Sequence, residues 1–367
     1  MDPSLPSAAS APLSGATLSW DITRACNLAC THCSNADDRE NAGPDLKIES
    51  AAHMLAEFVE AGGTALHVLG GEPFLRKDIL TEIALARQLG LSVSLTTNGT
   101  VIPDDDAVDW LLQQLSTLTI SLDGSNAAIN DCIRGLDTFS RATRALTKYR
   151  ARRDHAGAPA KLNVSHVLCR GNVSSIVAMI DCVTECGGDE VSITYLKPYG
   201  NALRLDAPMP ATALGLRDAF LAAGVRAETA GIAVTLFEVP MRVQTWLRQQ
   251  SLTRVRFAGD TYCDTAEGQL RASSDGKVFP CFAGTKHHAQ HAATTDDLNI
   301  ERVSLRTMLE GSFYADFKRS AHSALASTPW TICQGCEHFH SKACYPGCPF
   351  EPKNLKPQLC ALLEAGR

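Results

Sequence analysis

Three cysteines, Cys26, Cys30 and Cys33, lie within the stretch CNLACTHC near the start of the chain. A C-x3-C-x2-C spacing lets one short loop turn three thiolates toward one face of an iron–sulfur cube. Core packing gives no reason for three thiols to gather within eight residues. A zinc site would need a fourth ligand from far along the chain. The spacing therefore predicts an iron–sulfur cluster with one coordination position left for another ligand.

A second motif, Gly70-Gly71-Glu72-Pro73, follows a short apolar stretch. Glycines allow the backbone to approach a ligand closely, and a carboxylate can accept hydrogen bonds from an ammonium group. The tripeptide at 97–99, TNG, and the tetrapeptide at 121–124, SLDG, end two further apolar stretches. Each of these is also a common turn sequence, so the prediction that they contact a ligand depends on their sharing one site.

The C-terminal part of the chain holds seven of its 14 cysteines. In a reducing compartment, clustered cysteines are more often metal ligands than disulfides. A zinc ribbon and iron–sulfur clusters both fit C-x2-C pairs at such spacing. The seven residues are Cys263, Cys281, Cys333, Cys336, Cys344, Cys348 and Cys360.

Alternating extended and helical segments predict how these motifs are positioned. Strands are expected at 17–23, 65–73, 91–99, 118–124, 162–169 and 191–198, with helices between them. Such alternation indicates βα units and a parallel sheet. Six units are too few to close a barrel of eight, so the fold class is α/β, a partial (β/α)6 TIM-like barrel with a small cysteine-rich domain after it. The site is then expected at the carboxyl ends of the strands.

The chain divides into four predicted regions. Residues 1–16 read as a disordered lead-in without the features of a signal peptide. Residues 17–200 form the barrel, 201–262 a bridging helical segment with helices near 211–223 and 241–250, and 263–367 a domain organised by metal clusters.

Composition restricts the partners of the chain. Hydrophobic residues make up 45% of it, and its net charge is −6 without a basic block. This balance argues against a nucleic-acid partner. No apolar run reaches the roughly 20 residues that would span a bilayer. We expect a cytoplasmic protein with no membrane partner.

The cysteine loop, the preceding strand and the GGEP turn together resemble radical S-adenosylmethionine (SAM) enzymes. The resemblance implies that Cys26, Cys30 and Cys33 hold a [4Fe–4S] cluster whose fourth iron binds the amino and carboxylate groups of SAM. The reduced cluster would cleave SAM to methionine and a 5′-deoxyadenosyl radical. An electron donor such as flavodoxin or ferredoxin would supply the reducing electron.

The same resemblance assigns the SAM contacts. Gly70, Gly71, Glu72 and Pro73 would bind the amino group, and Ser121 and Asp123 would lie near the ribose and carboxylate. Arg134 could pair with the carboxylate or be a solvated loop residue. The remaining contacts are Asn98 at the barrel mouth, Leu196 against the adenine, and His32, which stands where the family often has an aromatic residue.

The C-terminal cysteines resemble the SPASM extension of radical SAM proteins, which carries two auxiliary [4Fe–4S] clusters. By resemblance, Cys333, Cys336, Cys344 and Cys360 hold the outer cluster, and Cys263, Cys281 and Cys348 the inner one. Seven cysteines leave one of eight positions for an open iron or a non-cysteine ligand. The gap between Cys336 and Cys344 is longer than in the usual family pattern.

Two substrate classes remain open. The first is a ribosomally synthesised peptide or protein, which the enzyme would crosslink, oxidise or epimerise. The second is a small molecule such as an aminocyclitol or sugar alcohol, which it would dehydrogenate. No N-terminal domain that could capture a leader peptide is expected before the cysteine loop. Phe282 stands where sulfatase-maturing relatives place an acidic residue, which disfavours that activity.

Overall fold

The computed structural model describes residues 12–36, 44–204, 209–259, 268–285, 297–326, 330–344, 348 and 355–364. These residues form a ten-stranded sheet in the order β10-β9-β1-β2-β3-β4-β5-β6-β7-β8. Strands β1 to β8 are all parallel neighbours, β9 is parallel to β1, and β10 is antiparallel to β9. The strands are β1 (Thr17–Asp21), β2 (Ala65–Leu69), β3 (Ser92–Thr97), β4 (Thr117–Ser121), β5 (Lys161–Leu168), β6 (Glu190–Tyr195), β7 (Ala233–Phe237), β8 (Val255–Ala258), β9 (Gln269–Ala272) and β10 (Val278–Phe279).

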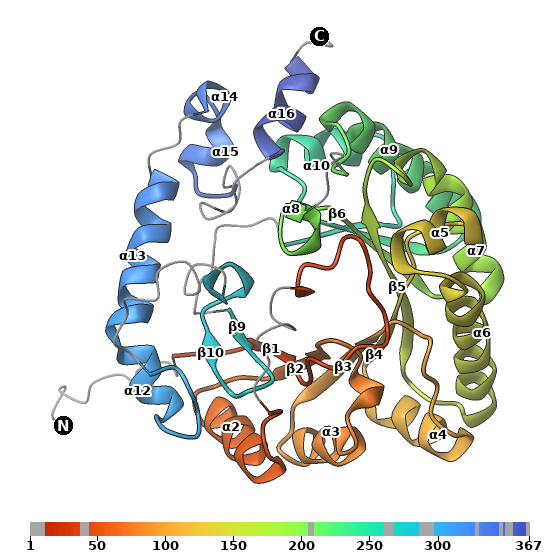
Figure 1. The fold of residues 1–367 in the computed structure, drawn as a ribbon. Helices are drawn as coiled ribbons and strands as arrows, with labels where there is room; N and C mark the ends of the chain where they lie inside the picture. The colour runs from red at the N-terminus through yellow and green to blue at the C-terminus, as the bar shows by residue number, and fades with distance from the viewer. Residues whose placement is uncertain are drawn as a thin grey trace, which may run out of the picture.

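Helices follow the outer face of the curved sheet, so that the strands line the inside of an open barrel (Figure 1). The barrel helices are α2 (Ile48–Glu60), α3 (Ile79–Gln88), α4 (Asp105–Gln114), α5 (Ala127–Arg134), α6 (Thr138–Ala156), α7 (Ile176–Cys186), α8 (Asn201–Arg204), α9 (Ala213–Ala230) and α10 (Met241–Arg248). The C-terminal helices are α12 (Leu305–Glu310), α13 (Ser312–Ala326), α14 (Thr331–Gln334), α15 (Glu337–His340) and α16 (Lys356–Glu364). Two 3-10 turns, Pro73–Leu75 and Val173–Ser175, follow β2 and β5. None of the described helices is long and apolar enough to cross a membrane.

The first βα unit shows why these residues fold as they do. In β1, Leu18 and Trp20 are buried and alternate with half-buried neighbours, as the two-residue period of a strand requires. In α2, the buried residues Ala51, Met54, Leu55 and Phe58 follow the i, i+3, i+4, i+7 spacing of one helix face. The strand and the helix therefore present apolar faces that one core can cover.

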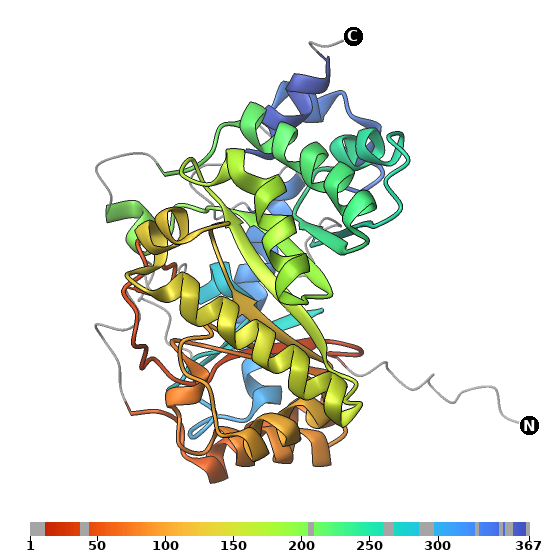
Figure 2. The same cartoon turned by 90° about the vertical axis from the view of Figure 1, so that its right-hand side faces the viewer.

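The fold class is confirmed, because the parallel sheet forms an open α/β barrel. The strands expected at six places correspond to β1 to β6, and helices near 211–223 and 241–250 correspond to α9 and α10. The sheet also continues into the segment expected to be a helical bridge, where β7 and β8 add two parallel strands. On the other edge, β9 from the C-terminal region pairs with β1. Helix α16 packs against α9 and α10, and α14 packs against α16; Figure 2 shows these C-terminal helices, in dark blue, at the top of the molecule near the C-terminus.

Arg76 fixes the point where β1 leads into the cysteine loop. Its guanidinium donates to the carbonyl oxygens of Ile22 at 3.0 Å and Leu46 at 2.6 Å. It also pairs with the buried Glu82 and lies over the Trp20 ring, 5.7 Å from the ring centroid. A buried arginine with a carboxylate partner and two carbonyl acceptors holds this backbone rigidly.

Candidate active site

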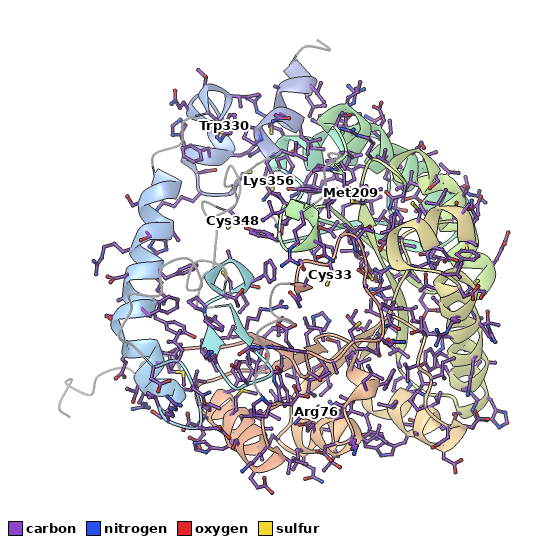
Figure 3. All side chains as sticks on the ribbon, in the orientation of Figure 1. Cys33, Arg76, Met209, Trp330, Cys348 and Lys356 are labelled. Carbon is purple, nitrogen blue, oxygen red and sulfur yellow. The ribbon has the colours of Figure 1, made fainter. Side chains whose placement is uncertain are left out.

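A cavity of about 350 Å³ opens at the carboxyl ends of the barrel strands. Its wall includes Gly70 and Gly71 after β2, Asn98 after β3, Ser121 at the end of β4 and Leu196 after β6. Parallel strands bring these ends to one side of a barrel, which is why residues so distant in sequence meet here. Figure 3 labels Cys33 near the centre of the barrel. The wall also contains Cys26, Cys30, Cys33, His32, Arg134, Lys197, Tyr199 and Phe282.

Four strand ends hold the cysteine loop in place. The Thr31 amide donates to the Ile133 carbonyl at 2.8 Å, where α5 ends. The Asn201 side chain donates to the Cys30 carbonyl at 2.8 Å, and the Asn201 amide donates to the Cys33 carbonyl at 3.0 Å. These bonds tie the loop to the segments after β4 and β6. The Gly71 amide, which donates to the Thr23 carbonyl at 2.7 Å, and the Asn98 side chain, which donates to Asn27 Oδ1 at 3.0 Å, tie it to the segments after β2 and β3. The loop is therefore ordered by the protein itself.

Gly70 and Gly71 bring the β2 turn against the backbone that precedes the cysteines. Gly70 has a φ of +144°, and a Cβ there would lie 2.5 Å from the Thr23 carbonyl oxygen. A Cβ on Gly71 would lie 2.1 Å from the carbonyl oxygen of Ala25. Both positions require glycine because the Gly71 and Glu72 amides donate to these same carbonyls, at 2.7 and 2.8 Å. The glycines thus serve the packing of two loops as well as leaving backbone exposed to the cavity.

Glu72 is fully buried, and the turn itself uses its carboxylate. The oxygens accept from Thr97 Oγ1 and the Asn98 amide, both at 2.7 Å, and from the Phe74 amide at 3.3 Å. Burial raises the pKa of Glu72, whereas the three hydrogen-bond donors act to lower it. Glu72 and Pro73 lie outside the cavity wall, so a direct contact of Glu72 with a ligand ammonium stays a prediction. Its visible role is to join the β2 and β3 loops.

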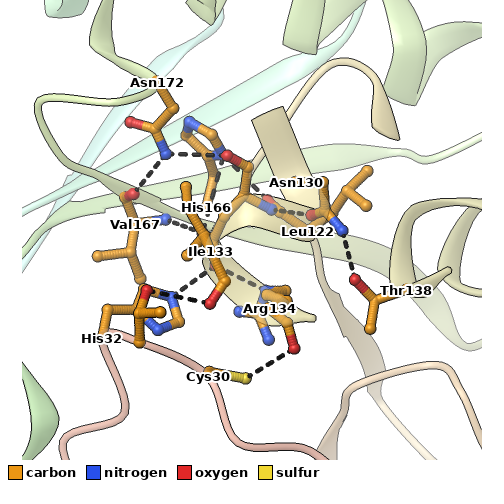
Figure 4. A network of polar contacts seen from close by, with 12 residues as sticks. Cys30, His32, Leu122, Asn130, Ile133, Arg134, Thr138, His166, Val167 and Asn172 are labelled. Carbon is orange, nitrogen blue, oxygen red and sulfur yellow. Dashed lines mark hydrogen bonds and ion pairs between the residues drawn. The ribbon is translucent and has the colours of Figure 1, made fainter. Parts of the chain in front are cut away.

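Asp123 is the centre of a buried polar network, and Figure 4 labels its partners His32, Arg134 and Val167. One oxygen lies 2.6 Å from His32 Nε2 and 2.6 Å from Arg134 Nε, the second contact being an ion pair without hydrogen-bond alignment. The other oxygen accepts from the Val167 amide at 2.7 Å, and the Asp123 amide donates to Asn130 Oδ1 at 2.9 Å. The carboxylate therefore joins the cysteine loop to β4, α5 and β5.

The charge of Asp123 depends on its cationic neighbours. Burial by itself would raise the pKa of this carboxyl, but Arg134 and His32 outweigh it and hold the pKa well below its usual range. Burial in turn lowers the pKa of His166, whose Nδ1 contacts the Leu122 carbonyl at 2.9 Å. Asp123 lies behind the cavity wall, where it contacts Arg134 and His32; its predicted place near the ribose and carboxylate of SAM stays a prediction.

His32 and Arg134 both line the cavity. The His32 Nδ1 atom is buried and has no hydrogen-bond partner among the described residues. The pKa of Arg134 is raised: burial acts to lower it, but the nearby Asp123 overcomes that effect. The cavity wall therefore contains a buried cation, Arg134, together with the His32 ring, one nitrogen of which has no hydrogen-bond partner among the described residues. A carboxylate-bearing polar ligand such as SAM fits this wall.

The three first-loop cysteines fit a cluster that binds each thiolate through a separate iron. The described residues contain no set of three or more His, Cys, Asp or Glu side chains that could share a single metal ion. Thiolates of a [4Fe–4S] cube surround a volume and need not converge on a point. Burial raises the pKa of Cys30 to about 11; Arg134 opposes this shift, and Cys33 and Cys26 add to it. The thiols are thus close enough to repel one another as thiolates, which a cationic cluster would relieve.

Four C-terminal cysteines meet at a second, smaller cavity. Cys333, Cys336, Cys344 and Cys360 all line it, and they are the four predicted for one cluster. Burial raises the pKa of Cys360 to about 12, and the neighbouring Cys344 and Cys333 contribute to the increase. The structure thus brings together residues from α14, the turn between α14 and α15, the loop after α15, and α16. Cys281 and Cys348 are half-buried, whereas Cys263 lies outside the described residues.

Phe282 and Tyr199 form an aromatic side of the cavity. Phe282 packs edge-on against Tyr199, with ring centroids 5.3 Å apart, and the Arg271 guanidinium lies 4.8 Å from its centroid. Both rings line the cavity. This side of the cavity therefore favours an apolar or aromatic group.

Of the ten predicted SAM-contact residues, the structure places seven in the cavity wall, which are Gly70, Gly71, Asn98, Ser121, Arg134, Leu196 and His32. Sequence reasoning missed the residues that hold the wall together. Asn130 is buried and hydrogen-bonds to Asp123, but it lies in α5, which was not predicted. Asn201 follows Gly200, whose Cβ would lie 2.3 Å from the Cys33 carbonyl oxygen. The Gly-Asn pair after a predicted strand was the available signal.

Residues 20–158 match the family model of the radical SAM superfamily. This part of the chain is therefore a radical SAM domain. The matched range includes the cysteine loop, the GGEP turn and Arg134, all of which line or support the main cavity.

The known relatives include peptide-modifying proteins. The chain is 32% identical over 198 residues to mycofactocin maturase MftC of Mycobacterium tuberculosis (strain ATCC 25618 / H37Rv), covering 53% of this chain and 48% of the relative. It is 28% identical over 333 residues to PqqA peptide cyclase of Streptomyces rochei, covering 88% and 81%. The chain spans about half the length of the curated relatives that match first.

Among solved structures, SuiB of Streptococcus suis bound to S-adenosylmethionine superposes with a TM-score of 0.65. The sequence identity is 18%, and the match covers 95% of this chain and 78% of SuiB. At this identity the likeness establishes the fold, which extends beyond the barrel into the cysteine-rich region.

Proposed function

We propose that the chain is a radical SAM enzyme that modifies a ribosomally synthesised peptide or protein by removing a hydrogen atom from it. The observation that carries the proposal is the single cavity in which Cys26, Cys30 and Cys33 face the Gly70–Gly71 backbone and Arg134. A purely structural cysteine loop would not need an open cavity beside its thiols with a buried cation, Arg134, in the wall.

Different residues of the chain would bind the iron–sulfur cluster and SAM. The three cysteines would hold a [4Fe–4S] cluster, and the Gly70–Gly71 backbone, Asn98 and Ser121 would bind the polar groups of SAM. Arg134, fixed by Asp123, would pair with its carboxylate. When bound and reduced, the cluster and SAM supply a 5′-deoxyadenosyl radical. The walls of the cavity keep water away from that radical and hold the substrate carbon close to it.

Relatives support the peptide substrate. They are named as a maturase and a peptide cyclase, and one structure holds SuiB with its precursor peptide SuiA. The Phe282 and Tyr199 wall offers a surface for an apolar or aromatic side chain of such a peptide. The alternative substrate, an aminocyclitol or sugar alcohol, would offer this wall less apolar surface than an aromatic or aliphatic peptide side chain.

We further propose that residues 263–367 are a SPASM-like domain with two auxiliary [4Fe–4S] clusters. Convergence of four cysteines on one cavity supports the outer cluster. The inner cluster would use Cys263, Cys281 and Cys348, with an open iron or a non-cysteine ligand. An electron donor such as flavodoxin or ferredoxin would reduce the protein in the cytoplasm.

The test is anaerobic reconstitution of the wild type and of a Cys26/Cys30/Cys33→Ala variant, followed by counts of iron and dithionite-driven SAM cleavage. Three and two cubes correspond to about 12 and about 8 iron atoms. Only the wild type should form 5′-deoxyadenosine. Cys132→Ala, which removes an exposed cysteine outside both cavities, is the matched control and should behave as the wild type.

Each result decides a different part of the proposal. Formation of 5′-deoxyadenosine by the triple variant would contradict the assignment of the first cluster. About 4 iron atoms with zinc in the wild type would contradict the auxiliary clusters while leaving the radical SAM assignment intact. Incubation with candidate peptides and cyclitols, analysed by mass spectrometry, then separates the two substrate classes.

A further inference from the structure

The four-cysteine cavity is lined by cations. Besides Cys333, Cys336, Cys344 and Cys360, its wall contains Arg242 and Lys356 as charged residues, together with His338. No carboxylate occurs among the described residues that line it. The positive charge of this lining favours an anionic group in the cavity.

Lys356 is the more unusual of the two cations, because it is 1% exposed. A buried ammonium destabilises the folded state unless nearby negative charge compensates it. Lys356 is the first residue of α16 and Cys360 lies one turn later, so both side chains project from one face of this helix. Figure 3 labels Lys356 at this position.

The carboxylate near Lys356 already has another partner. Glu238 approaches Lys197 with its two oxygens 2.6 and 2.5 Å from the ammonium nitrogen. Burial acts to raise the pKa of Glu238, but Lys197 first and Lys356 second outweigh it and lower the pKa. Glu238 is therefore influenced by two ammonium groups, and the second of these, Lys356, also lines the four-cysteine cavity.

We propose that Lys356, assisted by Arg242, supplies the positive charge that offsets a thiolate-bound [4Fe–4S] cluster in this cavity and thereby raises its reduction potential. The inference rests on the auxiliary cluster of the proposed function. One electron from an external reductant adds a negative charge to a site that four thiolates already make negative. A desolvated cation nearby stabilises the reduced form more than the oxidised form, because Coulomb interactions are strong at low dielectric.

The experiment uses the full chain with Cys26, Cys30, Cys33 and Cys281 replaced by alanine, so that only the four-cysteine cavity should retain a cube. In this background, Lys356→Met removes the charge and Lys356→Arg keeps it. Lys342→Met removes an exposed lysine near Cys344, where solvent screens the charge, and is the matched control. Each protein is reconstituted anaerobically, its iron is counted, and its midpoint potential is measured by a dithionite titration followed by electron paramagnetic resonance.

We expect a lower midpoint potential in Lys356→Met than in the background protein, and values near the background in Lys356→Arg and Lys342→Met. Loss of iron in Lys356→Met with retention in Lys356→Arg would also support the charge requirement. The inference is overturned if Lys356→Met keeps both its iron and the background potential, or if Lys356→Arg changes as much as Lys356→Met.

Failure of the proposed cofactor gives a different result. The background protein would then bind zinc or no metal, and no paramagnetic reduced state would appear in any variant. Comparing the thermal unfolding of Lys356→Met with that of a Glu238→Gln/Lys356→Met double variant adds a separate readout. If Lys356→Met has the midpoint potential of the background protein and the double variant regains the lost thermal stability, then Lys356 serves only to compensate the charge of Glu238.

Discussion

Replacing Asp123 with asparagine tests the charge network beside the cysteine loop. The substitution keeps the side-chain shape, and Oδ1 can still accept from the Val167 amide, which now donates to the carboxylate at 2.7 Å. It removes the negative charge between His32 and Arg134 and places an amide donor where both contacts were made at 2.6 Å. The Arg134 guanidinium is then buried without a counter-charge.

The expected cost follows from that burial. The side chain of Asp123 is 0% exposed and that of Arg134 is 10% exposed, so solvent provides little compensation. Removing one partner of such a pair typically costs about 3–5 kcal/mol, against a total stability of about 5–15 kcal/mol. Urea unfolding of the metal-free, reduced protein, followed by circular dichroism, measures the difference. An Asp123→Asn/Arg134→Met double variant removes the orphaned cation and should recover part of the loss.

The pH dependence of the free energy of unfolding provides a second test of the Asp123 charge. Because the pKa of Asp123 is lower in the folded protein than its ordinary 3.8, the folded state binds fewer protons than the unfolded state near that pH. Its stabilising contribution is therefore complete above pH 3.8 and is lost as the pH falls below this value. A loss under about 1 kcal/mol at neutral pH, or no recovery in the double variant, would refute the reasoning.

Three further predictions concern the same barrel. Gly71→Ala should abolish binding of the first cluster, because the new Cβ would lie 2.1 Å from a backbone oxygen. Iron counting tests this. The control variant Gly171→Ala, whose new Cβ would have its nearest contact at 3.9 Å, should retain the cluster. Burial lowers the pKa of His67 to about 4, so between pH 6.5 and 4 the unfolded chain binds a proton that the folded chain does not. The free energy of unfolding should therefore fall over this pH range, by at most about 3 kcal/mol. Urea unfolding of the wild type and of His67→Gln measures this, and a difference between them that does not change with pH would contradict the prediction. Asn201→Ala removes a donor to the Cys30 carbonyl and should cost about 1 kcal/mol while accelerating iron loss to a chelator; unchanged release would exclude an anchoring role.

The strands of the barrel and the three first-loop cysteines were predictable because their signals are local. The alternating burial of β1 and the helical spacing of buried residues in α2 follow from the order of residues within each segment. The C-x3-C-x2-C spacing and GGEP are equally compact. Resemblance then extended these signals to Ser121 and Arg134, which the structure places in the same cavity.

The unpredicted features depend on long-range packing. Asp123 looks like a ligand contact in sequence, yet it lies behind the wall because α5 covers it and Asn130 caps its amide. Strands β7 and β8 are short and lie in a segment rich in helical residues, so only pairing with β6 selects them. The buried position of Lys356 among cysteines has no local signal, since lysine is usually exposed.

The pairing of β9 with β1 has a consequence for how the protein can be divided. Strand β1 lies between β2 and β9, and Arg271 of β9 holds Asp21 of β1 with contacts of 2.7 and 2.8 Å. A chain cut before residue 268 would expose the edge of β1 immediately before the cysteine loop, and exposed edges promote aggregation. Supplied as a separate polypeptide, the C-terminal piece should reassociate by strand addition. The protein is thus suited to fragment complementation, in which recovery of solubility reports that the two pieces have joined.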